Sequence, residues 1–253
     1  MGNGSLLELR RGALSLLPWA PLFLLLVTSR PGAAGPVRLA PGEYITENGW
    51  GHLTLKRDPS GGLTFAIEAV GSNAHSCSLD GEIVDGRATL AAAEEGKPCR
   101  LRFLPEGDGI QVTAAEAGPC AYFCGARARF EGLYLKPAPG CSPPARDKTR
   151  SEFKKLYDQK AYAQAFATLK PLLEGCAKTT GPVEKAWIRN DLALTAYKRN
   201  DRAGCRRLLE PLAADAARGD AALRGEMAPA DADDYLPVVK ATRTNLKLCR
   251  DRK

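Results

Sequence analysis

The sequence predicts an α+β protein of two domains, a small antiparallel β-barrel or sandwich followed by α-helical hairpin repeats. Three observations predict this fold class. Short alternating apolar segments separated by turn residues fill the first half, a proline-rich stretch follows, and one pattern recurs after 40 residues in the second half. The predicted boundaries are a signal peptide at 1–34, a disulfide-bonded β domain at 36–136, a proline-rich linker at 137–146 and a helical domain at 147–253.

The first segment is typical of a secretory signal peptide. Arg10 and Arg11 precede an apolar run at 13–27, and the small residues 32–34 form a cleavage site. The run has about 15 residues, whereas a spanning helix needs roughly 20. An uncleaved membrane anchor is the alternative. We therefore expect a periplasmic or secreted protein that is not membrane-integral after cleavage.

The β domain is predicted from period-two alternation between turn signals. The Asp85-Gly86 pair between two apolar runs is a strong hairpin signal, because both turn residues must take positive φ. Seven or eight short strands in about 100 residues fit a closed barrel or a sandwich. The expected strands are 43–46, 52–56, 63–67, 77–84, 87–90, 99–103, 110–113 and 126–135.

Export decides how the cysteines are interpreted. An even number of cysteines in an exported chain predicts disulfides, and four precede the linker region while four follow from 141 onward. We expect each domain to close its own pairs, with three connectivities open in each. Half of a zinc site at Cys120 and Cys124 is the alternative, but a structural zinc site needs four ligands. The eight are Cys77, Cys99, Cys120, Cys124, Cys141, Cys176, Cys205 and Cys249.

The linker is a stiff spacer, since residues 136–144 hold four prolines. After it, Tyr157, Leu169 and Pro171-Leu172 recur 40 residues later as Tyr197, Leu209 and Pro211-Leu212. The pattern predicts stacked helical hairpins and resembles a degenerate tetratricopeptide repeat. Proline in each second helix should kink or tighten it. The expected helices are 149–158, 161–175, 183–198, 202–218 and 235–250, with a loose connection at 219–233.

Charge divides between the two halves. Residues 36–137 carry 10 Lys or Arg against 13 Asp or Glu, and residues 138–253 carry 23 against 15. The basic charge is mixed with acids and lacks interleaved aromatic residues, so the sequence disfavours nucleic-acid binding. The excess of basic residues in the second half indicates either a solvated helical surface or a face that binds an acidic partner.

Catalytic chemistry has few candidate residues. His52 and His75 are the only histidines, and neither lies near a Gly-x-Ser-x-Gly motif, which is absent. The sequence also lacks His-Glu-x-x-His, Cys-x-x-Cys and a phosphate-binding glycine loop. We expect no catalytic residues, no metal and no cofactor. His52 is interpreted as a strand residue and His75 as part of a polar loop.

Two segments carry a family resemblance. They are Asn73-Ala74-His75-Ser76-Cys77 and Tyr122-Phe123-Cys124-Gly125-Ala126-Arg127-Ala128. With them the chain resembles, over about residues 40–137, a group of small exported proteobacterial proteins, some of them loosely linked to lysozyme inhibitors. The resemblance implies an envelope location. The region after 137 differs from the cysteine-rich segment associated with that inhibitor group.

These observations favour a non-catalytic protein that binds another envelope or extracellular protein. An inhibitor or immunity-like role against a wall-degrading enzyme is the sharpest form, because the acidic first domain would attract a basic target. The candidate binding residues are Asn73, His75, Tyr122 and Arg127. Two alternatives stay open: an envelope enzyme acting on peptidoglycan or polysaccharide, and a barrel that binds a small ligand.

Overall fold

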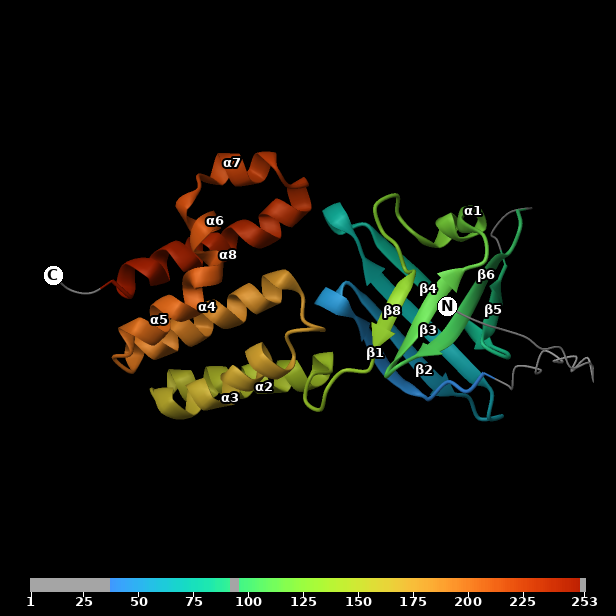
Figure 1. Ribbon diagram of the computed structural model, residues 1–253, viewed down its shortest axis with the longest axis horizontal. Coiled ribbons are helices and arrows are strands. Elements are labelled where there is room, and N and C mark those ends of the chain that lie inside the picture. The colour runs from blue at the N-terminus through green and yellow to red at the C-terminus, as the bar shows by residue number, and fades with distance from the viewer. Residues whose placement is uncertain (1–36, 92–95, 251–253) are drawn as a thin grey trace, which may run out of the picture. The chain divides into compact units, whose positions relative to one another are not determined.

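The computed structural model describes residues 37–91 and 96–250, so the predicted signal peptide lies outside the described residues. Figure 1 shows a β-barrel followed in the chain by a set of helices, which confirms the α+β class. The strands are Gly42–Thr46 (β1), Gly51–Arg57 (β2), Leu63–Val70 (β3), Ser76–Ile83 (β4), Arg87–Leu90 (β5), Cys99–Glu106 (β6), Gly109–Ala114 (β7) and Gly132–Leu135 (β8).

The barrel is an antiparallel meander in which neighbours in the sheet are also neighbours in the chain. β8 pairs with β1 and so joins the two ends of the meander. The ring stays open between β4 and β5, where Val84 and Arg87 exchange main-chain hydrogen bonds beside the Asp85-Gly86 turn. Asp85 and Gly86 both have positive φ, as the hairpin signal predicts.

Alternation fills the barrel interior with side chains. Phe65 and Phe103 are buried with ring centroids 4.9 Å apart, and Tyr134 is fully buried. The Tyr134 hydroxyl donates to the carbonyl of Phe130 at 2.7 Å, and burial raises the pKa of this phenol. Hydrophobic burial of this kind stabilises the fold by roughly 1.5–3 kcal/mol for each large side chain. The interior is therefore a packed core.

The last strand is shorter than the sequence predicts. Residues 126–131 were expected to continue it, but β8 begins at Gly132. The Glu131 carboxylate accepts the main-chain N–H of Ala114 at 2.7 Å, so a side chain takes the position where a longer strand would pair with β7. Residues 126–131 instead form an irregular segment. The alternation of small residues with arginine was wrong evidence for a strand.

The helices are α1 in the barrel half and α2–α8 after it. They span Ala117–Cys120 (α1), Pro143–Asp158 (α2), Tyr162–Gly175 (α3), Pro182–Lys198 (α4), Arg202–Leu209 (α5), Ala213–Ala217 (α6), Asp220–Gly225 (α7) and Pro229–Leu248 (α8). Short 3-10 turns lie at Glu47–Gly49 (η1), Ser72–Ala74 (η2), Ala121–Phe123 (η3) and Glu210–Leu212 (η4).

Three helix boundaries differ from expectation. α2 begins at Pro143, inside the predicted linker, because proline suits the first turn of a helix where its missing N–H costs nothing. Pro211 lies where the expected helix at 202–218 divides into α5, η4 and α6, since proline clashes with the preceding turn. The equivalent Pro171 lies inside α3, which stays continuous. The expected loose connection at 219–233 contains α7 and the start of α8.

The 40-residue repeat appears as two helical hairpins with equivalent turns. Lys160 and Asn200 both take positive φ, 60° and 64°, and their N–H groups donate to the carbonyls of Tyr157 and Tyr197, both at 2.9 Å. In the second helix of each hairpin, Leu169 and Leu209 are fully buried at matching positions. The repeat in the sequence is therefore a repeat in backbone geometry.

The four disulfides lie within the predicted halves. Cys77 pairs with Cys124 and Cys99 with Cys120 in the barrel half; Cys141 pairs with Cys176 and Cys205 with Cys249 in the helical half. Such bridges indicate an oxidising compartment. Cys141, inside the predicted linker, is thereby bridged to Cys176 at the end of α3.

We predict that Cys141→Ser with Cys176→Ser lowers the free energy of unfolding by about 2–4 kcal/mol, because the bridge restricts the unfolded chain. Urea denaturation followed by circular dichroism measures the change. A midpoint equal to that of the oxidised wild type would contradict the assignment of this bridge.

Candidate functional site

The two segments of the resemblance meet at one place on the barrel. The Cys77–Cys124 disulfide joins them, the same two residues form an antiparallel bridge, and the Gly125 N–H donates to the carbonyl of Ser76 at 2.8 Å. We call the surface formed by residues 71–77 and 120–129 the motif face. It contains all four candidate binding residues of the sequence analysis.

Two glycines let the segments approach. A Cβ added at Gly71 would lie 1.9 Å from the carbonyl oxygen of Arg127. A Cβ added at Gly125 would lie 2.5 Å from Nδ1 of His75. Both spaces are closed to any larger residue, so these glycines are required by packing. His75 is half-buried, and its ring lies against Gly125.

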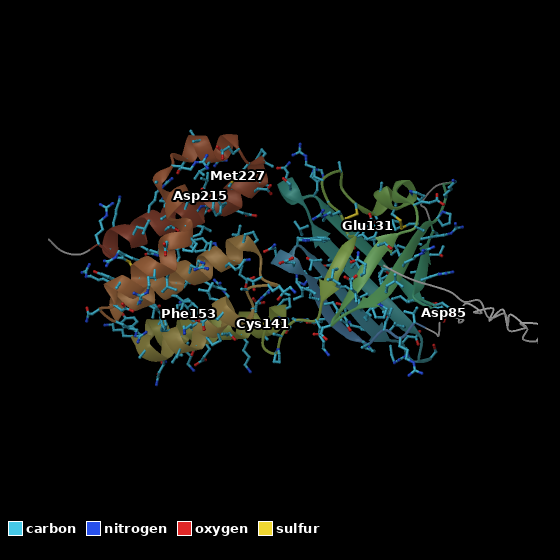
Figure 2. All side chains as sticks on the ribbon, in the orientation of Figure 1. Asp85, Glu131, Cys141, Phe153, Asp215 and Met227 are labelled. Atoms are coloured by element: carbon cyan, nitrogen blue, oxygen red, sulfur yellow. A yellow bond between two sulfur atoms is a disulfide. The ribbon has the colours of Figure 1, made fainter. Side chains whose placement is uncertain are left out.

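Tyr122 and Arg127 present their side chains to solvent. Tyr122 is 67% exposed and its ring lies edge-on to Phe123, with centroids 5.4 Å apart. Both rings belong to η3, between Cys120 and Cys124, which are each bridged to the sheet. The motif face therefore holds an exposed aromatic side chain on a rigid turn. Figure 2 shows the side chains of this part of the barrel, with Glu131 labelled.

A shallow hollow of about 520 Å³ lies beside these residues, lined by Trp50, Val70, Gly71, Ser72 and the segment 126–129. Arg129 places its guanidinium 5.0 Å from the ring centroid of Trp50, a cation–π contact. Val70 is 60% exposed at its rim. Arginine and tryptophan are among the residues enriched at protein-binding hot spots.

Asn73 has an internal role. Its Oδ1 accepts the N–H of Ala230 at 3.1 Å, in the first turn of α8. Asp231, one residue further, accepts hydrogen bonds from the Ser72 hydroxyl at 2.6 Å and from the Asn73 N–H at 2.9 Å. The helix's own N-cap residue, Ala228, has no side chain that can cap.

This arrangement is a capping box built between two parts of the chain. In an ordinary capping box, the N-cap side chain and the third helical residue bond each other's main-chain N–H groups. Here Asn73 in the barrel turn η2 supplies the capping side chain, and the Asp231 carboxylate accepts the main-chain N–H of Asn73 in return. The hydrogen bond from Ser72, followed by that from Asn73, lowers the pKa of Asp231 below its ordinary value, and the charge of Arg127 adds to the effect.

A second asparagine turn makes a similar contact. The Asn48 N–H donates to the carbonyl of Lys178 at 2.8 Å, and Lys185 Nζ donates to Asn48 Oδ1 at 3.0 Å. A Cβ added at Gly49 would lie 2.9 Å from the Thr179 carbonyl oxygen. Asn48 and Asn73 both have positive φ. Asparagine tolerates the left-handed backbone conformation, so these two residues could have been predicted from the sequence as turn positions.

His52 lies on β2, as predicted, and burial lowers its pKa, with the charge of Arg146 as the second cause. No group of three His, Cys, Asp or Glu side chains positioned to hold a metal ion occurs within the described residues. Residues 37–91 and 96–250 also contain no helix with the length and apolar character needed to cross a bilayer.

Comparison with known protein families, curated proteins and solved structures found no match to this chain.

We predict that Gly71→Ala destabilises the protein by about 1–3 kcal/mol, because the new methyl group overlaps the main chain of Arg127. Gly118→Ala is the matched control, since a Cβ there meets nothing within 4 Å. Thermal unfolding compares the two variants. Equal unfolding temperatures would contradict the close approach of the two segments.

We predict that Asn73→Ala loosens the first turn of α8 by about 1 kcal/mol, the usual effect of a lost cap. Hydrogen exchange at the N–H of Ala230 measures this loosening.

The contact of Asp231 with Ser72 and Asn73 depends on pH. Because the pKa of Asp231 is lower in the folded protein, the contact is fully present above the unfolded pKa of about 4 and is lost as the pH falls through the folded pKa.

Asp231→Asn should remove this acid dependence, and Asp234→Asn, on an exposed part of the same helix, should leave it unchanged. Acid-dependent exchange that persists in the Asp231→Asn variant would show that another group controls the contact.

Proposed function

We propose that the protein is a non-catalytic periplasmic or secreted binding protein whose partner is another envelope or extracellular protein. In its more specific form, the proposal is an inhibitor or immunity-like protein against a cell-wall-degrading enzyme. The motif face is the proposed contact surface.

The exposed Tyr122 on its doubly bridged turn carries the proposal. Tyrosine supplies a large contact area with little side-chain entropy to lose, and a rigid turn reduces the ordering cost of binding further. Arg127 belongs to the same face and is also exposed. Tyrosine and arginine are enriched among the residues that dominate binding energy.

The acidic balance of the barrel half favours a basic partner there. This half carries 10 Lys or Arg against 13 Asp or Glu, whereas residues 138–253 carry 23 against 15, so a positively charged enzyme of lysozyme type is attracted locally to the barrel half. Arg127 and Arg129 then meet carboxylates or carbonyls of the partner at short range. Charge complementarity of this kind raises the association rate more than the affinity.

The four candidate residues divide into two roles under this proposal. Tyr122 and Arg127 contact the partner, because their side chains are exposed. Asn73 and His75 position the face, because Asn73 caps α8 and His75 packs over Gly125. The helical half, which we propose to be tetratricopeptide-like from its two equivalent hairpins, anchors the loop that carries Asn73.

We predict that Tyr122→Ala weakens binding to a basic lysozyme by more than about tenfold, as expected for a central anchor. Leu104→Ala is the control, since Leu104 is 49% exposed on the outer face of β6. Calorimetric titration measures affinity, and lysis of cell-wall material measures inhibition. Unchanged binding by the Tyr122→Ala variant would contradict the motif face as the contact surface. Hydrolysis of wall material by the protein itself would contradict the non-catalytic assignment.

A further inference from the structure

Three arginines stand together on the outer face of β5 and β6. Arg87 on β5 lies directly opposite Arg102 on β6, and Arg100, two residues before Arg102, lies opposite Thr89. All three side chains are exposed. We call Arg87, Arg100 and Arg102 the arginine ladder.

The register brings these charges as close as a sheet allows. Arg87 exchanges its main-chain hydrogen bonds with Val84, so its N–H and C=O groups point away from β6. The Arg87–Arg102 pair is therefore of the non-hydrogen-bonded kind, in which opposing Cβ atoms lie roughly 4.5–5.5 Å apart. Arg100 follows at about 7 Å along the same strand face.

In the part of the chain that the structure describes, no carboxylate is paired with the ladder. Within residues 37–91 and 96–250, none of the three arginines has an ion pair, a hydrogen bond from its side chain or a ring contact. Like charges directly opposite each other destabilise a sheet. The ladder is also a local exception, because the barrel half as a whole has more acidic than basic residues. Three close, unneutralised guanidinium groups are suited to an anion supplied from outside.

The surroundings limit the shape of that anion. Asp80 and Glu82 lie on β4 across the open side of the barrel, and Asp85, labelled in Figure 2, lies at the turn between β4 and β5. Glu106 and Asp108 flank the turn after β6. A broad anionic surface such as a bilayer would bring its charge against these carboxylates. A narrow chain would cover the ladder while avoiding them.

The neighbouring side chains limit its chemistry. Thr89, Gln111 and Thr113 project from the outer faces of β5 and β7 and offer hydroxyl and amide groups. No aromatic side chain is exposed on β5, β6 or β7 in the described structure, so there is no platform on which nucleobases could stack. Hydroxyl-bearing, negatively charged sugars fit this set of groups.

We propose that the arginine ladder binds a linear acidic polysaccharide. Its sulfate, phosphate or carboxylate groups accept paired hydrogen bonds from the guanidinium groups, which present two parallel N–H donors to such anions. None of the three arginines belongs to the motif face, which β6 contacts through the Cys99–Cys120 bridge, so this proposal does not depend on the protein-binding role.

The test measures binding of the full mature chain to dextran sulfate, with neutral dextran as the uncharged comparison. The ladder variant carries Arg87→Ser, Arg100→Ser and Arg102→Ser. The matched control carries Lys148→Ser, Lys155→Ser and Arg207→Ser, three exposed helical residues without ion pairs, and so loses the same charge. We expect the ladder variant to bind at least about tenfold more weakly with a smaller salt dependence, and the control to change less than about twofold.

Several results would overturn the proposal. Equal losses in both variants would assign binding to net charge, and a loss only in the control would assign it to the helical half. Tighter, ladder-dependent binding to single-stranded DNA or to phosphatidylglycerol vesicles than to dextran sulfate would exclude a polysaccharide as the preferred partner.

Folding is checked separately. Removing like charges should leave the unfolding temperature of the ladder variant unchanged or raised. A variant with lysine at all three positions keeps the charge but lacks the forked donors, so it should bind with an intermediate affinity. Full wild-type binding by the lysine variant would contradict paired recognition by guanidinium groups.

Discussion

The Cys77–Cys124 bridge is the constraint on which the other features depend. It joins β4 to a segment 47 residues later and fixes the height of that segment over the sheet. Because Gly71 and Gly125 lack a Cβ, the main chain of Arg127 can lie against Gly71 and the imidazole of His75 against Gly125. The turn η2 ordered in this way presents Asn73 to the first turn of α8. One covalent link thus joins the two segments of the motif face, and the neighbouring turn η2 bonds the first turn of the last long helix.

The two proposed binding surfaces use different physics. The motif face combines an exposed ring, a guanidinium and a hollow on a rigid support, which favours a shaped protein partner. The arginine ladder is a flat charged surface with polar neighbours and no exposed ring, which favours a flexible polyanion. A protein of the cell envelope that carried both would hold its protein partner close to an acidic glycan, where wall-degrading enzymes act.

The sequence predicted most strands because alternation and turn residues are local signals, and the Asp85-Gly86 hairpin is the clearest example. It was wrong about 126–131, where Phe130 is buried but the Glu131 carboxylate, and no strand main chain, accepts the N–H of Ala114 on β7. The sequence named the loop around His75 and the segment from Tyr122 to Arg127 as candidate contacts, and the structure brings the two segments together through the Cys77–Cys124 bridge. The capping role of Asn73 was missed. That role depends on Asp231, which lies 158 residues away along the chain.

By itself the sequence determined the α+β division, the repeat of two hairpins and the separation of the disulfides into two groups, because each follows from residues close together in the chain or from their number. Only the tertiary structure decided which cysteines pair, that the last strand begins after Glu131, and that a barrel turn caps a distant helix. It also placed Arg87 opposite Arg102, which depends on strand register. Long-range pairing sets these features, and no local preference of the chain specifies it.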